Sequence, residues 1–153
     1  MNKTNDESHQ IYFRISQIKK NAFFEKDLAS LGATVQDLAT LKIDLAINIG
    51  QNSEEGLFII KFRAIYKIKD NLQILGIESE SIFSILDHQL VLKNDDCGNM
   101  LIPQDILNKF AAIAVGATRG MLAVMNTNPQ YQEYVLPPIN IEKMLSEENR
   151  RKY

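Results

Sequence analysis

The sequence predicts an α+β fold in which a four-stranded antiparallel sheet carries a long C-terminal helix on one face. Two observations lead to this prediction. Residues 41–85 contain three segments with the residue pattern of strands, joined by short turns. From residue 106 onward, the apolar residues recur at helical spacing instead. A change of period at this point is typical of a sheet followed by the helix that covers it.

The clearest predicted strand is residues 41–49, LKIDLAINI, because every second residue is leucine or isoleucine. The turn-forming stretch GQNSEEG separates it from a second strand at residues 57–68. A Lys-Asp-Asn turn then leads to a third strand at residues 72–85, and residues 12–18 (YFRISQI) form a weaker one. Connections this short predict an antiparallel meander or a Greek-key-like sheet.

The predicted helix has Pro103 at its first position, apolar residues at helical spacing over residues 106–125, and Asn126 among the residues that end it. Residues 24–40 are too long for a hairpin turn, so this crossing segment must pass over the sheet or one of its edges. Within it, Thr34 and Asp37 have the spacing of a helix cap. Near the C-terminus, LPPINIEKML predicts an extended stretch and then a short amphipathic turn.

Composition predicts one domain at residues 11–145, between a disordered leader (1–10) and a flexible tail (146–153). The chain has 153 residues, is 45% hydrophobic and carries a net charge of -2, which disfavours nucleic-acid binding by counterion release. It has one cysteine, Cys97, no apolar run of about 18 residues and no apolar region typical of a signal peptide. We therefore expect a soluble cytoplasmic protein without membrane insertion.

Candidate catalytic groups are few. Cys97, His88, Asp95 and Asp96 could form a Cys–His pair or a metal cluster, but DDCGN lacks the paired spacing of metal ligands. GATRG at residues 116–120 lies inside the helical pattern, where its N–H groups are already bonded, so it predicts close helix packing and not a phosphate loop. We expect no catalytic residue, no metal and no cofactor.

Glu78 and Glu80 stand two residues apart on one predicted strand, so their side chains share a face. They form either a solvated acidic stripe or a docking site for a basic partner. The chain also has more apolar residues than one helix can cover, notably in the crossing segment. This surplus predicts subunit pairing or a groove between the crossing segment and the helix that binds extended apolar peptides.

Five segments, in order across residues 15–145, resemble motifs of the SecB family of bacterial protein-export chaperones. ISQIKKNAFFE matches the end of that family's first strand, KIDLAI its Lys-x-Asp-Leu strand and ESIFSI its Gly-Ile-Phe-Ser-Ile strand. NMLIP matches the Asn-x-Leu-Phe-Pro motif that opens its helix, and LPPINIEKML its closing Leu-x-Pro-Val-Asn-Phe motif.

The resemblance implies a homodimer or homotetramer, built as a dimer of dimers, that holds unfolded or preprotein polypeptides without catalysis or a cofactor. Export-type members then deliver their clients to the SecA motor. By position, the residues implied to line the client-binding groove come from the crossing segment and from two later motifs: Phe24, Leu28, Leu31, Val35, Leu38, Phe83, Ile85, Leu101 and Ile102.

The motor docks on an acidic face in export-type members, and this sequence keeps only part of that face. Glu25 preserves one acid, whereas Asn21 and Gly76 stand where two others are expected. The possible docking residues are therefore Glu25, Glu78 and Glu80. SecB-like chaperones also protect the antitoxin of a toxin–antitoxin pair, so an antitoxin is an alternative partner. A third alternative is an oligomeric scaffold protein with the same fold.

Overall fold

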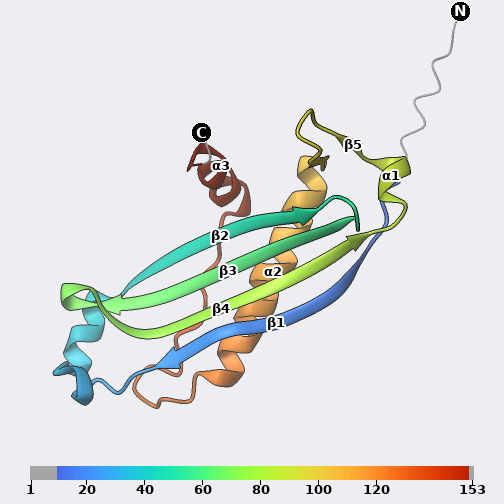
Figure 1. The fold of residues 1–153 in the computed structure, drawn as a ribbon. Helices are drawn as coiled ribbons and strands as arrows, with labels where there is room; N and C mark the ends of the chain where they lie inside the picture. The colour runs from blue at the N-terminus through green and yellow to red at the C-terminus, as the bar shows by residue number, and fades with distance from the viewer. Residues whose placement is uncertain (1–9, 152–153) are drawn as a thin grey trace, which may run out of the picture.

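A computed structural model describes residues 10–151, whose four longest strands form a single antiparallel sheet (Figure 1). These strands are β1 (Phe13–Glu25), β2 (Lys42–Asn52), β3 (Leu57–Ile68) and β4 (Leu72–Ile85). Their order across the sheet is β1-β4-β3-β2. The last three follow one another as hairpins, and β1 lies beside β4, which gives a Greek-key arrangement. The predicted α+β fold class is confirmed.

The predicted bounds of β3 and β4 match the structure, whereas β1 continues to Glu25 instead of ending at Ile18. Its pairing with β4 shifts register between Ile15 and Gln17 and again between Lys20 and Ala22. Each bulge inserts one unpaired residue and so changes which face the following side chains occupy. The side chains of β1 therefore do not alternate regularly between the two faces. For this reason the period-2 pattern in the sequence predicts only the first half of the strand.

One side of the sheet, the covered face, packs against α2 (Gln104–Met125), which Figure 1 shows crossing behind the strands. Pro103 lies just before the first helical residue. Phe110 of α2 stacks on Phe83 of β4, with ring centroids 4.2 Å apart, and contacts Phe13 of β1 edge to face at 4.7 Å. Every second residue of β3 from Phe58 to Ile68 is buried on this face. The opposite side of the sheet is named the open face, and no helix of residues 10–151 crosses its centre (Figure 1).

The segment after α2 covers a further part of the hydrophobic core, to which it contributes Tyr131, Leu136 and Leu145. It runs back beside α2 and ends in α3 (Ile141–Arg151), which lies near the β2 edge (Figure 1). Arg119 of α2 holds this segment, because its guanidinium donates to the carbonyl oxygens of Leu136 at 3.2 Å and Pro137 at 3.1 Å. Residues 146–151, placed by the sequence in a flexible tail, continue α3.

Short elements close the two ends of the sheet. At one end lie the 3-10 turns η1 (Ala29–Leu31) and η2 (Val35–Thr40) of the crossing segment and η3 (Lys69–Asn71); at the other lie α1 (His88–Val91), β5 (Lys93–Asn94) and β6 (Met100–Leu101). The predicted cap is confirmed, since Thr34 N–H donates to Asp37 Oδ2 at 2.7 Å. Residues 1–9 of the predicted leader lie outside the described residues. Across residues 10–151, no helix combines the length and apolar character needed to cross a membrane.

Candidate binding surfaces

Strand β1 forms one edge of the sheet, and its only strand neighbour among the described residues is β4. Two of its isoleucines are exposed: Ile15 is 46% accessible and Ile18 is 39% accessible. They pair with Phe83 and Ser81, whose side chains lie on the covered face. A regular strand would turn residues three apart to opposite faces, but the bulge between them places Ile15 and Ile18 on the same side. The edge strand thus presents two apolar side chains beside α2.

The outward side of α2 is uncharged after Lys109. Its exposed residues beyond that point are Ala112, Gly116, Gly120, Ala123 and Val124, and Val124 is 79% accessible. A methyl group added at Gly116 or Gly120 would meet open space. The close packing that the sequence predicts at these two glycines is therefore not made within the described chain.

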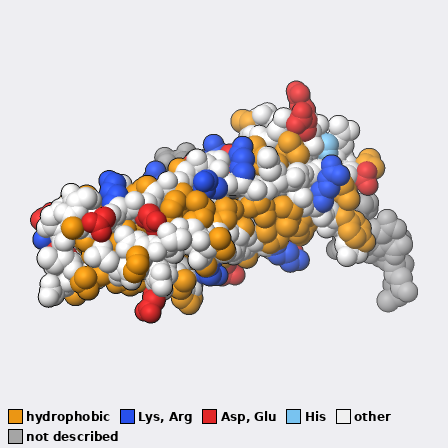
Figure 2. Space-filling model, turned by 90° about the horizontal axis from the view of Figure 1, so that it is seen from below, with side chains coloured by type: hydrophobic (Ala, Val, Ile, Leu, Met, Phe, Trp, Pro, Cys, Tyr) orange, Lys and Arg blue, Asp and Glu red, His pale blue; other side chains and the backbone are white. Residues whose placement is uncertain are grey.

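Two flanks of α2 can be distinguished by its hydrogen bonds. Arg119 reaches the segment that returns beside α2, so the helix positions across the axis from Arg119 lie on the opposite flank. Those positions are Ile113, Ala117 and Val124. Together with Ile15 and Ile18 they form a surface that we name the apolar belt. Figure 2, which views the molecule from below, shows hydrophobic side chains across the middle of this side with lysines and arginines around them.

The residues predicted to line a client groove do not come together in one place. Leu28, Phe83 and Ile85 are in the core, because their side chains turn toward the covered face or beneath the crossing segment. Val35 and Leu101 are exposed but lie at opposite ends of the sheet, in η2 and β6. Their assignment to a groove stays a prediction. The remaining four are half-buried: Phe24, Leu31, Leu38 and Ile102.

The space between the crossing segment and the end of α2 is filled by the chain itself. Tyr131 and Leu136 are buried there. The Tyr131 hydroxyl donates to the carbonyl oxygen of Lys26, and Gln130 Oε1 accepts from Leu28 N–H at 3.4 Å. Glu25 secures the same segment, because its carboxylate accepts hydrogen bonds of 3.0–3.3 Å from Thr127 and Asn128. The sequence offers only one signal for this packing, the two tyrosines Tyr131 and Tyr134 within a polar stretch.

The expected acidic stripe on the open face is largely neutralised. Glu80 is only 8% accessible, and its carboxylate lies 2.8 Å from Lys19 Nζ and 3.4 Å from Lys61 Nζ. The hydrogen bond from Lys19 holds the pKa of Glu80 below its ordinary value. Glu78 is half-buried, with Asn21 Nδ2 3.5 Å from its Oε1. Because lysines on both neighbouring strands face Glu80, this acid is enclosed; docking of a basic partner here stays a prediction.

Groups suited to catalysis are dispersed. No cluster of three or more His, Cys, Asp or Glu that could hold a metal occurs within residues 10–151. His88 packs over Gly56, and Asp95 accepts hydrogen bonds from the N–H groups of Cys97 and Asn99, which shapes the β5–β6 turn. Burial raises the pKa of Tyr66 to about 12, so this phenol remains protonated at neutral pH.

No known family model matches the sequence, and no curated protein matches it. Several solved structures resemble it weakly, and two of them illustrate the likeness. One is the Mycobacterium tuberculosis SecB-like chaperone Rv1957 in complex with a ChAD peptide from the Rv1956 HigA1 antitoxin. It has a TM-score of 0.45 and 13% identity, with 83% of this chain and 90% of that chain covered. The other is a protein of unknown function from Streptococcus agalactiae, with a TM-score of 0.42, 9% identity and coverage of 86% and 98%. Similarity this low establishes neither a family nor a function.

Proposed function

We propose that the protein is a client-holding chaperone of the SecB type, which binds unfolded polypeptides without catalysis. The observation that carries this proposal is the apolar belt. An unpaired strand edge accepts an extended chain through backbone hydrogen bonds, and exposed apolar side chains beside it accept alternate client side chains. An unfolded client presents both features. The order of SecB-like motifs along the sequence gives independent support.

The affinity expected of one apolar belt for a client is that of a chaperone that holds its clients weakly, and not that of a receptor that binds its ligand tightly. Burying the exposed half of one isoleucine contributes roughly 1 kcal/mol, so Ile15 and Ile18 together supply only roughly 2 kcal/mol. Useful retention of a client then requires several such belts on one assembly. We therefore propose that the protein works as a homodimer or homotetramer, with Ala112, Gly116 and Gly120 on the outer face of α2 available for subunit contact.

For the partner, we favour an antitoxin or another non-export client over preproteins delivered to the SecA motor. The motor of export-type members docks on acids, and here Glu80 is paired with two lysines while Glu25 is bonded to the turn after α2. A titration with the SecA motor tests this choice. Undetectable binding together with holdase activity supports the non-export branch, whereas tight binding would restore the export role.

Suppression of aggregation tests the holdase proposal. The wild-type protein should keep a chemically denatured model protein soluble at near-stoichiometric amounts. The double variant Ile15→Asn/Ile18→Asn should need roughly tenfold more protein, because both exposed apolar contacts are lost. Val35→Asn, an exposed aliphatic of the crossing segment, is the matched control and should behave as wild type.

Two outcomes would overturn the assignment to the belt. Loss of activity in Val35→Asn but not in the double variant would move the site to the crossing segment. If the wild-type protein is folded but suppresses no aggregation, the chaperone proposal is wrong and the scaffold alternative remains. In that case a hydrophobic dye should also fail to bind the apolar belt, because subunit contacts would bury it in the assembled protein.

A further inference from the structure

We propose that the open face of the sheet binds an acidic segment of a protein partner. This surface is separate from the apolar belt, and its charge differs in sign from that of the whole chain, which is -2. Strand register places six basic and three acidic side chains on it. The basic residues are Arg14, Lys19, Lys42, Lys61, Arg63 and Lys67, and the acidic residues are Asp44, Glu78 and Glu80.

Local pairing leaves part of this positive charge uncompensated. Glu80 forms ion pairs with both Lys19 and Lys61, and Lys67 forms one with Asp44. Arg63 lies directly across from Glu78 on the neighbouring strand, yet the Glu78 carboxylate lies beside Asn21 of β1 instead. Among the side chains that the structure describes, residues 10–148, Arg63 is therefore an exposed guanidinium without an ion pair.

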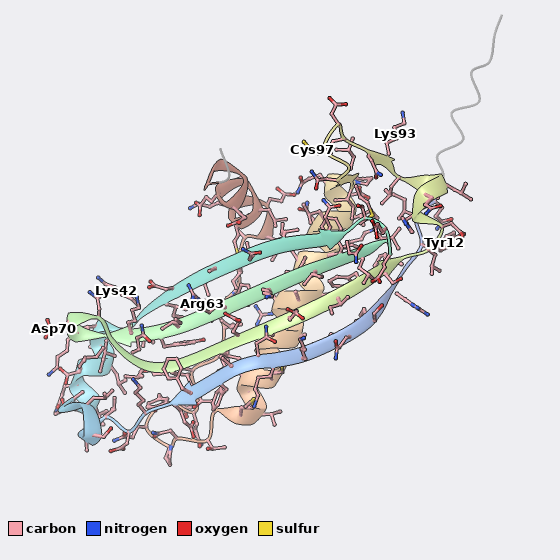
Figure 3. The ribbon with its side chains drawn as sticks, viewed as in Figure 1. Tyr12, Lys42, Arg63, Asp70, Lys93 and Cys97 are labelled. Atoms are coloured by element: carbon pink, nitrogen blue, oxygen red, sulfur yellow. The ribbon has the colours of Figure 1, made fainter. Side chains whose placement is uncertain are left out.

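The surface around Arg63 is hollowed. Two adjacent depressions, of about 490 and 510 Å³, share Arg63 and Ala46 as lining residues. Ala46 is the residue of β2 directly opposite Arg63, and its small side chain leaves room beside the guanidinium. Lys61 lines one depression and Lys67 the other. Figure 3 shows Arg63 within the sheet and Lys42 at the start of β2.

An extended acidic peptide fits this arrangement. Side chains two apart on a strand are spaced by about 7 Å, so Lys61 and Arg63 match carboxylates at alternate positions of an extended ligand. An acidic residue of the chain itself, Glu148 of α3, also lines the first depression. Asp44, Glu78 and Glu80 lie among these cations, so the surface offers few uncompensated positive charges, whereas nucleic-acid binding by counterion release needs many. These observations favour a polypeptide over a nucleic acid.

Fluorescence anisotropy with a labelled peptide of alternating glutamate and threonine tests the proposal at low salt. The wild-type protein should bind it, and a matched lysine–threonine peptide should bind at least tenfold more weakly. Arg63→Glu should weaken binding of the acidic peptide about tenfold, and Arg63→Gln about threefold, because a charge is reversed in one and removed in the other. Physiological salt should reduce the differences, since the site is exposed.

Lys109→Glu is the matched control, because it reverses an exposed cation of α2 away from the open face. It should change peptide affinity less than twofold. If Lys109→Glu and Arg63→Glu weaken peptide binding equally, the effect depends only on the net charge of the protein. That result would overturn the proposal. The absence of peptide binding, or tighter binding of a single-stranded oligonucleotide with the same dependence on Arg63, would also overturn it. Aggregation suppression should remain as in wild type for Arg63→Gln, which separates this proposal from the holdase role.

Discussion

The two faces of the sheet are built from the same four strands but are held by different forces. On the covered face, alternate residues of β3 and β4 are buried against α2, and Phe110 lies among three other phenylalanines. On the open face, charged side chains bridge neighbouring strands over half-buried isoleucines. Buried apolar area contributes strongly to stability, whereas ion pairs made by largely exposed lysines contribute little. Stability should therefore reside on one face, which leaves the other free to recognise a partner.

The largest effect is expected from Phe110→Ala. This fully buried ring contacts Phe13, Phe58 and Phe83, and its removal should lower the free energy of unfolding by about 3–5 kcal/mol. Urea denaturation measures the change. On the open face, truncation of half-buried Ile82 to alanine should cost less than about 2 kcal/mol. Similar costs for the two variants would contradict the division between the faces.

A smaller effect is expected from the hydroxyl pair between α2 and β4. Thr118 Oγ1 lies 2.6 Å from Ser79 Oγ and donates to the carbonyl oxygen of Ala114 at 2.8 Å, with both side chains fully buried. Thr118→Val should destabilise the protein by about 1–3 kcal/mol, because it leaves the Ser79 hydroxyl without this partner. Adding Ser79→Ala should restore part of the loss in the same denaturation assay. No recovery in the double variant would mean that packing, and not hydrogen bonding, dominates this contact.

The smallest effect is expected on the open face, from Glu80→Gln. The hydrogen bond from Lys19 lowers the pKa of Glu80 in the folded protein, so its charged form stabilises the fold above the unfolded pKa. That contribution should be below about 1 kcal/mol and should disappear as pH falls through the folded pKa, below the ordinary value of 4.5. Denaturation of wild type and variant from pH 7 to pH 3 measures it. A difference that stays constant over this range would exclude the ionic origin.

The elements that the sequence predicted are those with a regular period. The hairpin of β3 and β4 and the body of α2 repeat every two residues or at helical spacing over more than ten residues. The second half of β1 escapes such a pattern because of its two bulges. Helix α3 has the spacing of an amphipathic helix, with Ile141, Met144 and Leu145 packed on the core, but three apolar residues are too few to define the extent of a helix.

The candidate sites were less predictable than the fold. Phe83 and Leu101 have the same apolar character in the sequence, but one is buried beneath α2 and the other is exposed in β6. Their difference depends on which face the helix covers, which is a tertiary property. The exposure of Ile15 and Ile18 likewise depends on a bulge. Glu80 is enclosed because lysines from two other strands meet over it, and no local pattern encodes that meeting.

Hydrogen–deuterium exchange with and without an unfolded client tests the central claim most directly. If the client adds along the free edge of β1 and contacts the apolar belt, amides within residues 13–25 should exchange more slowly in its presence. Amides of the crossing segment should show little change. Unchanged exchange along β1 in a sample that suppresses aggregation would contradict the claim that the belt holds the client.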